Sequence, residues 1–131
     1  MGAQLHAYLM SEDARAQAKF YVEALGGEIL SLQTYGEVPG TPEAMKDKVM
    51  HLSLMAAGGN MLMISDSFEP VSGNRSISLA LTYDNASEAG EAYAKLGEGG
   101  EHKYPFAQQP WGAYYGEVID PFGVTWMITK S

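Results

Sequence analysis

Residues 111–128, WGAYYGEVIDPFGVTWMI, consist of two apolar runs separated by a turn. The turn is DPFG at residues 120–123, in which proline presets the backbone and glycine tolerates a positive φ angle. The flanking runs are short and rich in β-branched and aromatic residues, which favours strands over 113–119 and 124–129. This stretch therefore predicts two neighbouring strands joined by a tight turn.

Two amphipathic helices are predicted further upstream. The first follows Ser11, a good N-cap, and its apolar residues recur with helical spacing until Gly26 and Gly27 stop it. The second follows Asn85, another good N-cap, and ends at Gly97. Each helix has one apolar face, so each is expected to cover a sheet.

Six more strands are predicted from short β-like runs bounded by turn residues. They span residues 3–9, 28–36, 48–56, 60–65, 76–83 and 101–105. The segments 37–47 and 66–74, which carry Pro, Gly and Asp, are expected to be surface loops.

The predicted elements follow the order strand, helix and three strands, twice over. The two halves also resemble each other weakly at an offset of about 72 residues, so that His6 matches Ser78 and Asp13 matches Asn85. A duplicated βαβββ unit gives an α+β domain in which each helix covers one face of a sheet. We therefore expect a single domain over 1–131, with modules at about 1–66 and 75–131.

Composition excludes several classes of function. A formal charge of −8, with eight Lys and Arg residues scattered along the chain, leaves no basic stripe for nucleic acid. No apolar window approaches the length that spans a bilayer, so no membrane partner is expected. The absence of cysteine excludes disulfides and thiolate chemistry. Because no basic segment leads into an apolar run at the start, we expect a cytoplasmic protein.

Strand alternation separates an apolar face from a mixed one. Leu5, Ala7 and Leu9 are expected to lie under a helix, as is Ile77, whereas the opposite set holds His, hydroxyl, Met and Tyr side chains. A cavity for a small molecule explains that mixture. An ordinary solvent-facing sheet is the alternative, because antiparallel sheets often have one wet face.

Several segments together resemble a known superfamily. They are Phe20-Tyr21 with Leu25-Gly26-Gly27, Tyr35-Gly36-Glu37 with Pro39, Met50-His51, Ser65-Asp66, Gly73-Asn74, and the run 111–128. This pattern covers nearly the whole chain and resembles the vicinal oxygen chelate superfamily (glyoxalases, bleomycin resistance proteins and extradiol dioxygenases), most closely its PhnB-like branch. The resemblance implies paired βαβββ modules that form a curled open barrel, and a homodimer.

Metal-dependent members of that superfamily hold a divalent ion on the concave face of the sheet. The matching positions here are His6, fourteen residues before Phe20, and His51, Ser78 and Met127. Imidazoles suit zinc, iron or nickel, whereas a serine hydroxyl and a thioether are poor ligands for a divalent ion. Two good ligands out of four predict no tightly bound cofactor.

Glu117 could complete a site with the two histidines. Alternation turns Tyr115 and Glu117 to one face of their strand, and Gly116 to the other. A carboxylate near two imidazoles could form a two-His-one-carboxylate metal site or act as a general base. The alternative is a solvated glutamate on a wet face.

Two functions from different classes follow. The first is a protein that binds a small organic ligand in the concave cavity of the sheet without a complete metal site. The second is a lyase, isomerase or dioxygenase that uses His6, His51 and Glu117 with a divalent metal such as zinc, nickel, iron or manganese. The candidate cavity residues are His6, Tyr8, Tyr35, His51, Ser53, Ser78, Trp111, Tyr115, Glu117 and Met127. For Tyr35 and Trp111, packing at a dimer interface is the alternative.

Overall fold

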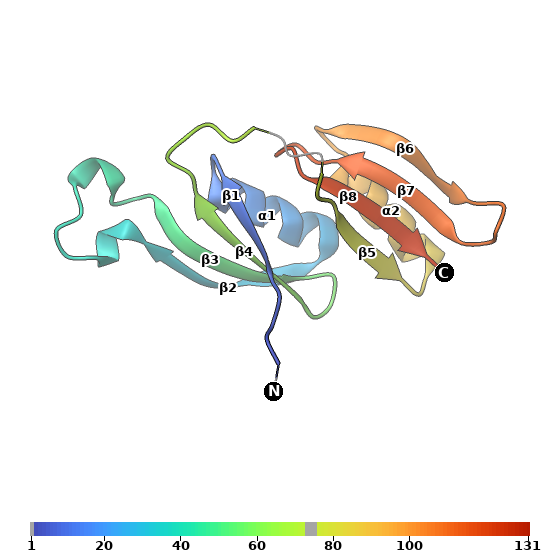
Figure 1. Ribbon diagram of the computed structural model, residues 1–131, viewed down its shortest axis with the longest axis horizontal. Coiled ribbons are helices and arrows are strands. Elements are labelled where there is room, and N and C mark those ends of the chain that lie inside the picture. The colour runs from blue at the N-terminus through green and yellow to red at the C-terminus, as the bar shows by residue number, and fades with distance from the viewer. Residues whose placement is uncertain (1, 73–75) are drawn as a thin grey trace. The chain divides into compact units, whose positions relative to one another are not determined.

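A computed structural model of the chain describes residues 2–72 and 76–131. Its elements follow the order βαβββ twice, with two short 3₁₀ turns in the first half (Figure 1). The first half contains β1 (Ala7–Ser11), α1 (Ala14–Leu25), β2 (Gly27–Thr34), η1 (Tyr35–Glu37), η2 (Glu43–Met45), β3 (Val49–Ala56) and β4 (Asn60–Asp66). The second half contains β5 (Leu79–Tyr83), α2 (Ala86–Leu96), β6 (Glu101–Gln108), β7 (Tyr114–Ile119) and β8 (Thr125–Lys130). The α+β fold predicted from the sequence is confirmed.

The chain divides into two units, Met1–Val71 and Ser72–Ser131. The first sheet has the strand order β1-β4-β3-β2 and the second has the order β5-β8-β7-β6. Both are mixed sheets, since the β1–β4 and β5–β8 pairs are parallel and the remaining pairs are antiparallel. Each sheet keeps two open edges, so neither closes on itself within the described residues.

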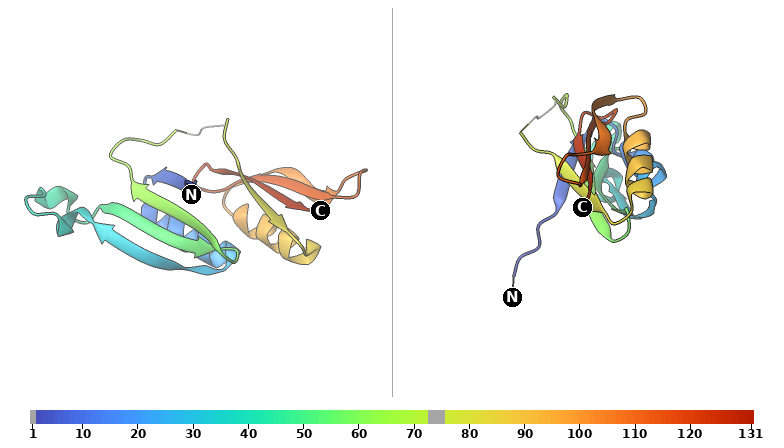
Figure 2. Two further views of the ribbon diagram at one scale, coloured as in Figure 1. Left: turned by 60° about the horizontal axis from the view of Figure 1, so that its bottom comes forward. Right: turned by 90° about the vertical axis from the view of Figure 1, so that its right-hand side faces the viewer.

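Each helix lies along one face of its own sheet (Figure 2). Between α1 and the first sheet the core contains Ala14, Ala18, Tyr21, Leu52, Leu54 and Ile64, all fully buried. Between α2 and the second sheet the corresponding core contains Ala89, Leu96, Val118, Trp126 and Ile128. These residues are the apolar sets that helical spacing and strand alternation predict.

The internal repeat is visible in the elements themselves. The starts of β1 and β5 are 72 residues apart, as are the helix N-caps Asp13 and Asn85. Asp13 accepts a hydrogen bond from the backbone N–H of Ala16, and Asn85 accepts one from that of Glu88. Both side chains therefore satisfy a donor that the first helical turn leaves unpaired.

The first helix begins later than predicted. Its N-cap is Asp13, not Ser11, because Ser11 is the last residue of β1 and its hydroxyl accepts a hydrogen bond from the N–H of Asp13. The second N-cap, Asn85, is as predicted.

The predicted strands 3–9 and 76–83 start too early. Regular pairing begins only at Ala7 and at Leu79, opposite Leu62 and Trp126. Leu5 and Ile77 therefore lie outside the strands and are 99% and 66% exposed, not covered by a helix. The alternation at Ile77 runs past the start of β8 at Thr125, whereas the ladder at β1 stops short of Leu5 although β4 extends to Asn60.

Strand β6 continues beyond the predicted end at Pro105, as far as Gln108. A proline cannot donate to the ladder, but β6 is an edge strand with one unpaired side, and its register shifts between Tyr104 and Ala107. The predicted loop 37–47 holds η2 and the last residue of η1. Of the predicted loop 66–74, Asp66 ends β4, and Gly73 and Asn74 lie outside the described residues. No described helix is long and apolar enough to cross a membrane.

Candidate functional site

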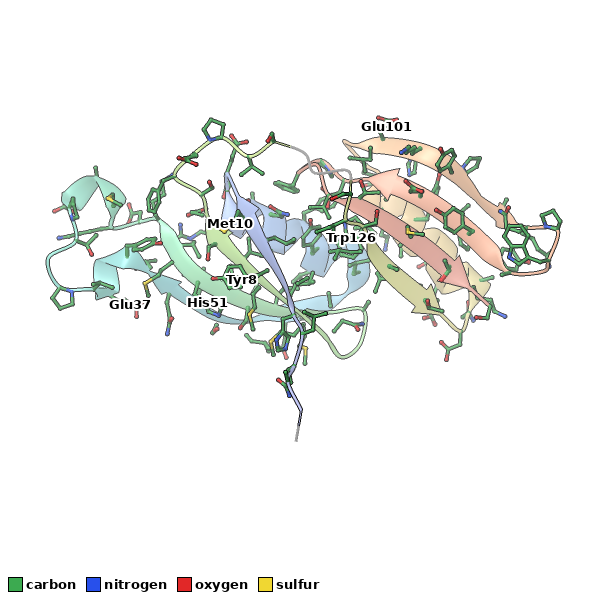
Figure 3. All side chains as sticks on the ribbon, viewed as in Figure 1. Tyr8, Met10, Glu37, His51, Glu101 and Trp126 are labelled. Carbon is green, nitrogen blue, oxygen red and sulfur yellow. The ribbon has the colours of Figure 1, made fainter. Side chains whose placement is uncertain are left out.

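A polar cluster lies on the face of the first sheet that is turned away from α1, which we call the first distal face. The Tyr8 hydroxyl is 3.1 Å from Nδ1 of His51 and 2.5 Å from the Ser65 hydroxyl. The Tyr8 and His51 rings are tilted by 43° with their centroids 5.7 Å apart, and both side chains are labelled in Figure 3. Tyr8 comes from β1, His51 from β3 and Ser65 from β4, so three neighbouring strands build this cluster.

The cluster is anchored to the backbone. The Ser65 hydroxyl donates to the carbonyl oxygen of Met50 at 2.8 Å, and Ser65 itself is only 6% exposed. Tyr8 is 48% exposed, so its ring forms part of the surface while its hydroxyl is held from below. The arrangement offers an aromatic ring and an imidazole in fixed positions.

Methionines surround this cluster on the same face. Residues opposite one another in a sheet point to the same side, and Tyr8 and Ser53 both lie opposite Met63. Met55 lies opposite Met61 on the same side. Ser53 also makes a hydroxyl–hydroxyl hydrogen bond of 2.8 Å with Ser31. The first distal face is therefore apolar with a few fixed polar groups.

A second cluster lies on the face of the second sheet that is turned away from α2, the second distal face. The Tyr115 hydroxyl donates to Oε2 of Glu117 at 2.7 Å, and the Lys103 ammonium is 3.5 Å from Oε1 of the same carboxylate. Gly116 faces α2, because a Cβ there would lie 2.8 Å from the ring of Tyr93. The orientation of Tyr115 and Glu117 that alternation predicts is thus the one observed.

The electrostatics of this second cluster are set by burial and by the carboxylate. Burial, the larger cause, and the hydrogen bond to Glu117 together raise the pKa of the Tyr115 hydroxyl to about 12. Met127 lies directly opposite Glu117 on β8, and Ala80 lies opposite Met127 on β5. Nearby, the hydroxyls of Thr82 and Thr129 are 2.9 Å apart.

Four candidate residues lie outside these two clusters. His6 and Ser78 each precede the first residue of a strand by one position, and both are exposed. Tyr35 is in η1, with its ring 5.4 Å from that of Phe68. Trp111, in the β6–β7 loop, is 75% exposed.

The structure thus brings Tyr8 and His51 together, and separately brings Tyr115, Glu117 and Met127 together. Sequence reasoning did not assign Ser65 or Lys103 to the site. Alternation along β4 would have placed Ser65 on the same face as Met61 and Met63. Nothing in the local sequence signals the Lys103–Glu117 pair, which depends on the register between β6 and β7.

Neither polar cluster by itself provides a set of metal ligands among the described residues. No three His, Asp or Glu side chains of this part of the chain gather closely enough to hold an ion. Glu117, the candidate carboxylate ligand, already accepts a hydrogen bond from Tyr115 and pairs with the Lys103 ammonium. An ammonium next to a carboxylate competes directly with a divalent cation for the same oxygens.

Three known proteins are similar to this chain. PA1353 from Pseudomonas aeruginosa is 32% identical, with a TM-score of 0.85 over 99% of this chain and 98% of that chain. A PhnB protein from Bacillus cereus is 24% identical and has a TM-score of 0.81 over 98% of this chain and 100% of that chain, which shows a shared fold. Protein YjdN of Escherichia coli strain K12 is 28% identical over 123 residues, 83% of this chain and 82% of YjdN.

The family assignment rests on the whole length of the chain. The family model described as Glyoxalase/Bleomycin resistance protein/Dioxygenase superfamily matches residues 3–128. That span includes both βαβββ units and both polar clusters. The chain belongs to the glyoxalase/bleomycin resistance protein/dioxygenase superfamily.

Proposed function

We propose that the protein binds a small organic molecule on the first distal face, around Tyr8 and His51. The observation that carries this proposal is the hydrogen-bonded cluster of Tyr8, His51 and Ser65 on a sheet face instead of in the core. Ligand sites typically combine a mostly apolar lining with a few fixed polar groups. The Met residues next to this cluster supply the apolar part.

A purely solvent-facing sheet explains this face less well. A sheet face that only meets solvent usually carries charged and polar side chains, which also discourage association with other protein chains. Here the strands present the half-exposed rings and thioethers of Tyr8, Met10 and Met63, while Ser65 is held beneath them. Ordering these side chains in one geometry costs conformational entropy that a merely wet face has no reason to lose.

We propose the same kind of role for the second distal face. Tyr115 and Glu117 supply a neutral hydroxyl and a carboxylate, and Met127 supplies an adaptable apolar surface. Lys103 balances the charge of Glu117, so this face suits a polar group that can insert into an existing ion pair. His6, Tyr35, Ser53, Ser78 and Trp111 remain candidate contacts of the ligand.

The side chains of the two polar clusters favour binding without catalysis. The second candidate is a metal-assisted lyase, isomerase or dioxygenase. It rests on the resemblance described above, which implies that His6 and His51 occupy metal-ligand positions of the superfamily. The ion pair at Glu117 opposes it, since the carboxylate that would complete the site is already engaged.

A ligand screen with matched histidine variants tests the proposal. A library of small organic molecules is screened against the whole chain by NMR, with His51→Asn and His102→Asn as the paired variants. His102 lies in β6 of the second sheet, where its Nε2 bonds the carbonyl oxygen of Tyr93. We expect hits that shift resonances of Tyr8 and Ser65 and that weaken at least about tenfold in His51→Asn, as expected for a lost polar contact. Hits that weaken equally in both variants, or that never perturb β1, β3 and β4, would contradict the proposal.

A further inference from the structure

The hydrogen bonds around Tyr8 have only one possible direction. The carbonyl oxygen of Met50 can only accept, so the Ser65 hydroxyl donates its single hydrogen to it, at 2.8 Å. Ser65 must then accept from Tyr8, at 2.5 Å, which uses the single hydrogen of the tyrosine. Tyr8 must in turn accept from His51, at 3.1 Å, so Nδ1 of the imidazole carries a hydrogen.

A neutral imidazole has one hydrogen, so the other nitrogen is then an acceptor. Nδ1 and Nε2 lie on different sides of the ring, and Nε2 is the nitrogen farther from the backbone. Within the described residues, Nε2 of His51 has no hydrogen-bond partner. The series of hydrogen bonds that runs from Met50 through Ser65 and Tyr8 to His51 therefore leaves Nε2 of His51 as its one free acceptor.

The surroundings of that acceptor are mostly apolar and adaptable, although Gln33 of β2 lies directly opposite His51. Tyr8 contributes an aromatic ring, and Met10, Met55, Met61 and Met63 point to the same side of the sheet by strand register. Thioethers make favourable contacts with aromatic rings and adjust to irregular shapes. None of these described side chains is cationic, so they offer no opposite charge to a bound anion.

We propose that Ser65 and Tyr8 lock His51 in its Nδ1–H form, so that Nε2 selects neutral aromatic ligands that carry a hydrogen-bond donor, such as a phenol. The ligand class rests on the proposed function, but the locked tautomer does not. Ser65 acts here as a positioning residue, since it touches neither the imidazole nor the ligand.

His102 provides an internal control with the opposite geometry. Its Nε2 lies 3.2 Å from the carbonyl oxygen of Tyr93, which can only accept. Nε2 of neutral His102 must therefore carry the hydrogen, as is usual for free imidazole. One protein should thus show two histidines in opposite tautomers.

The first test measures the tautomers directly by long-range ¹H–¹⁵N NMR of the full chain, in mildly alkaline solution where imidazoles are neutral. We expect the Nδ1–H pattern for His51 and the Nε2–H pattern for His102. In Ser65→Ala the Tyr8 hydroxyl is released to donate to Nδ1, so His51 should switch to Nε2–H. Ser67→Ala is the matched control, because this hydroxyl donates to the carbonyl oxygen of Glu69 instead of bonding Tyr8. An Nε2–H pattern for His51 in the wild type, or no switch in Ser65→Ala, would overturn the inference.

The second test compares phenol with anisole, its methyl ether, which has the same ring but no donor. Titrations followed at Tyr8 and His51 should show phenol binding about fivefold more tightly, the value of one neutral hydrogen bond. That preference should disappear in Ser65→Ala and persist in Ser67→Ala. Equal binding of both probes would overturn the ligand class and leave the proposed face intact. Binding of neither probe would overturn the ligand class and count against the proposed face, while the tautomer result stands or falls on its own.

Discussion

The carboxylate of Asp66, at the end of β4, accepts a hydrogen bond from the backbone N–H of Ala14 at 2.8 Å. Its second oxygen accepts from the N–H of Val49, the first residue of β3, at 2.6 Å. One buried side chain thus joins the start of α1 to the end of β4 and the start of β3. The negative charge also lies at the positive end of the helix, where it is stabilising.

Replacing this carboxylate should cost more stability than removing the N-cap itself. We expect Asp66→Ala to lower the free energy of unfolding by about 3 kcal/mol, because two buried N–H groups lose a charged acceptor. Asp13→Ala removes one hydrogen bond from an exposed cap and should cost about 1 kcal/mol. Urea denaturation of both variants compares them, and equal losses would contradict this account of Asp66.

Gly116 should be intolerant of even a methyl group. A Cβ at this position would lie 2.8 Å from the ring of Tyr93 and 2.8 Å from the backbone of Phe106. We expect Gly116→Ala to destabilise the protein by about 1–3 kcal/mol through overpacking. Gly59→Ala is the matched control, since nothing lies within 4 Å of its Cβ position. Thermal unfolding of the two variants should separate them clearly, and similar melting temperatures would refute the close packing of α2 on β7.

Tyr115 should make stability depend on alkaline pH. Burial and the hydrogen bond to Glu117 raise its pKa from 10.0 to about 12 in the folded chain. A raised folded pKa gives a contribution that is complete below pH 10 and is lost as the pH rises toward 12. We expect the unfolding free energy of the wild type to fall across this window more steeply than that of Tyr115→Phe.

Absorbance of tyrosinate gives an independent check on the causes of this shift. In Glu117→Gln the charged acceptor is gone, so the pKa of Tyr115 should decrease while remaining above 10.0, because burial, the larger cause, persists. A tyrosinate titration curve that Glu117→Gln leaves unchanged would show that the Tyr115 hydroxyl is not held as described.

The parts of the fold that depend on local chemistry could be predicted from the sequence. Asn85 at the second N-cap, the turn before β8 and the apolar sets of β3 and β8 all follow from residue type and spacing. Where a strand stops depends instead on whether a neighbouring strand is present to pair with it. Leu5 and Ile77 continue an apolar alternation but do not pair with the neighbouring strand, so the strand starts predicted from the alternation are wrong.

The candidate site shows the same division. Strand alternation predicts that Tyr8 and His51 point to one face and that Glu117 points away from α2. The structure has both of these orientations. Contacts between strands need the register as well. The bond from Tyr8 to Ser65 and the ion pair of Lys103 with Glu117 each join residues from different strands, and a one-residue slip would remove them.

We expect the protein to be a homodimer. β2 is an open edge strand, and Ile29, Leu30 and Leu32 are all exposed along it. Open edges with apolar side chains are prone to pair with another chain. Light scattering at micromolar concentration should give twice the chain mass. Leu30→Lys should shift the equilibrium toward monomer, while Ala94→Lys, at an exposed position of α2, serves as the charge control. A monomeric mass for the wild type would contradict the expectation.

Metal content decides between the two classes of function. We expect protein purified without added metal to hold far less than one divalent ion per chain, measured by elemental analysis after dialysis. Ser78 and Met127 are poor ligands, and Glu117 is paired with Lys103 and Tyr115, which leaves the imidazoles of His6 and His51. Lys103→Met removes the competing ammonium and should raise zinc affinity if Glu117 can act as a ligand at all. One ion per chain that survives dialysis in the wild type, and is released by His51→Ala and by Glu117→Ala, would make metal-assisted catalysis the better account of this fold.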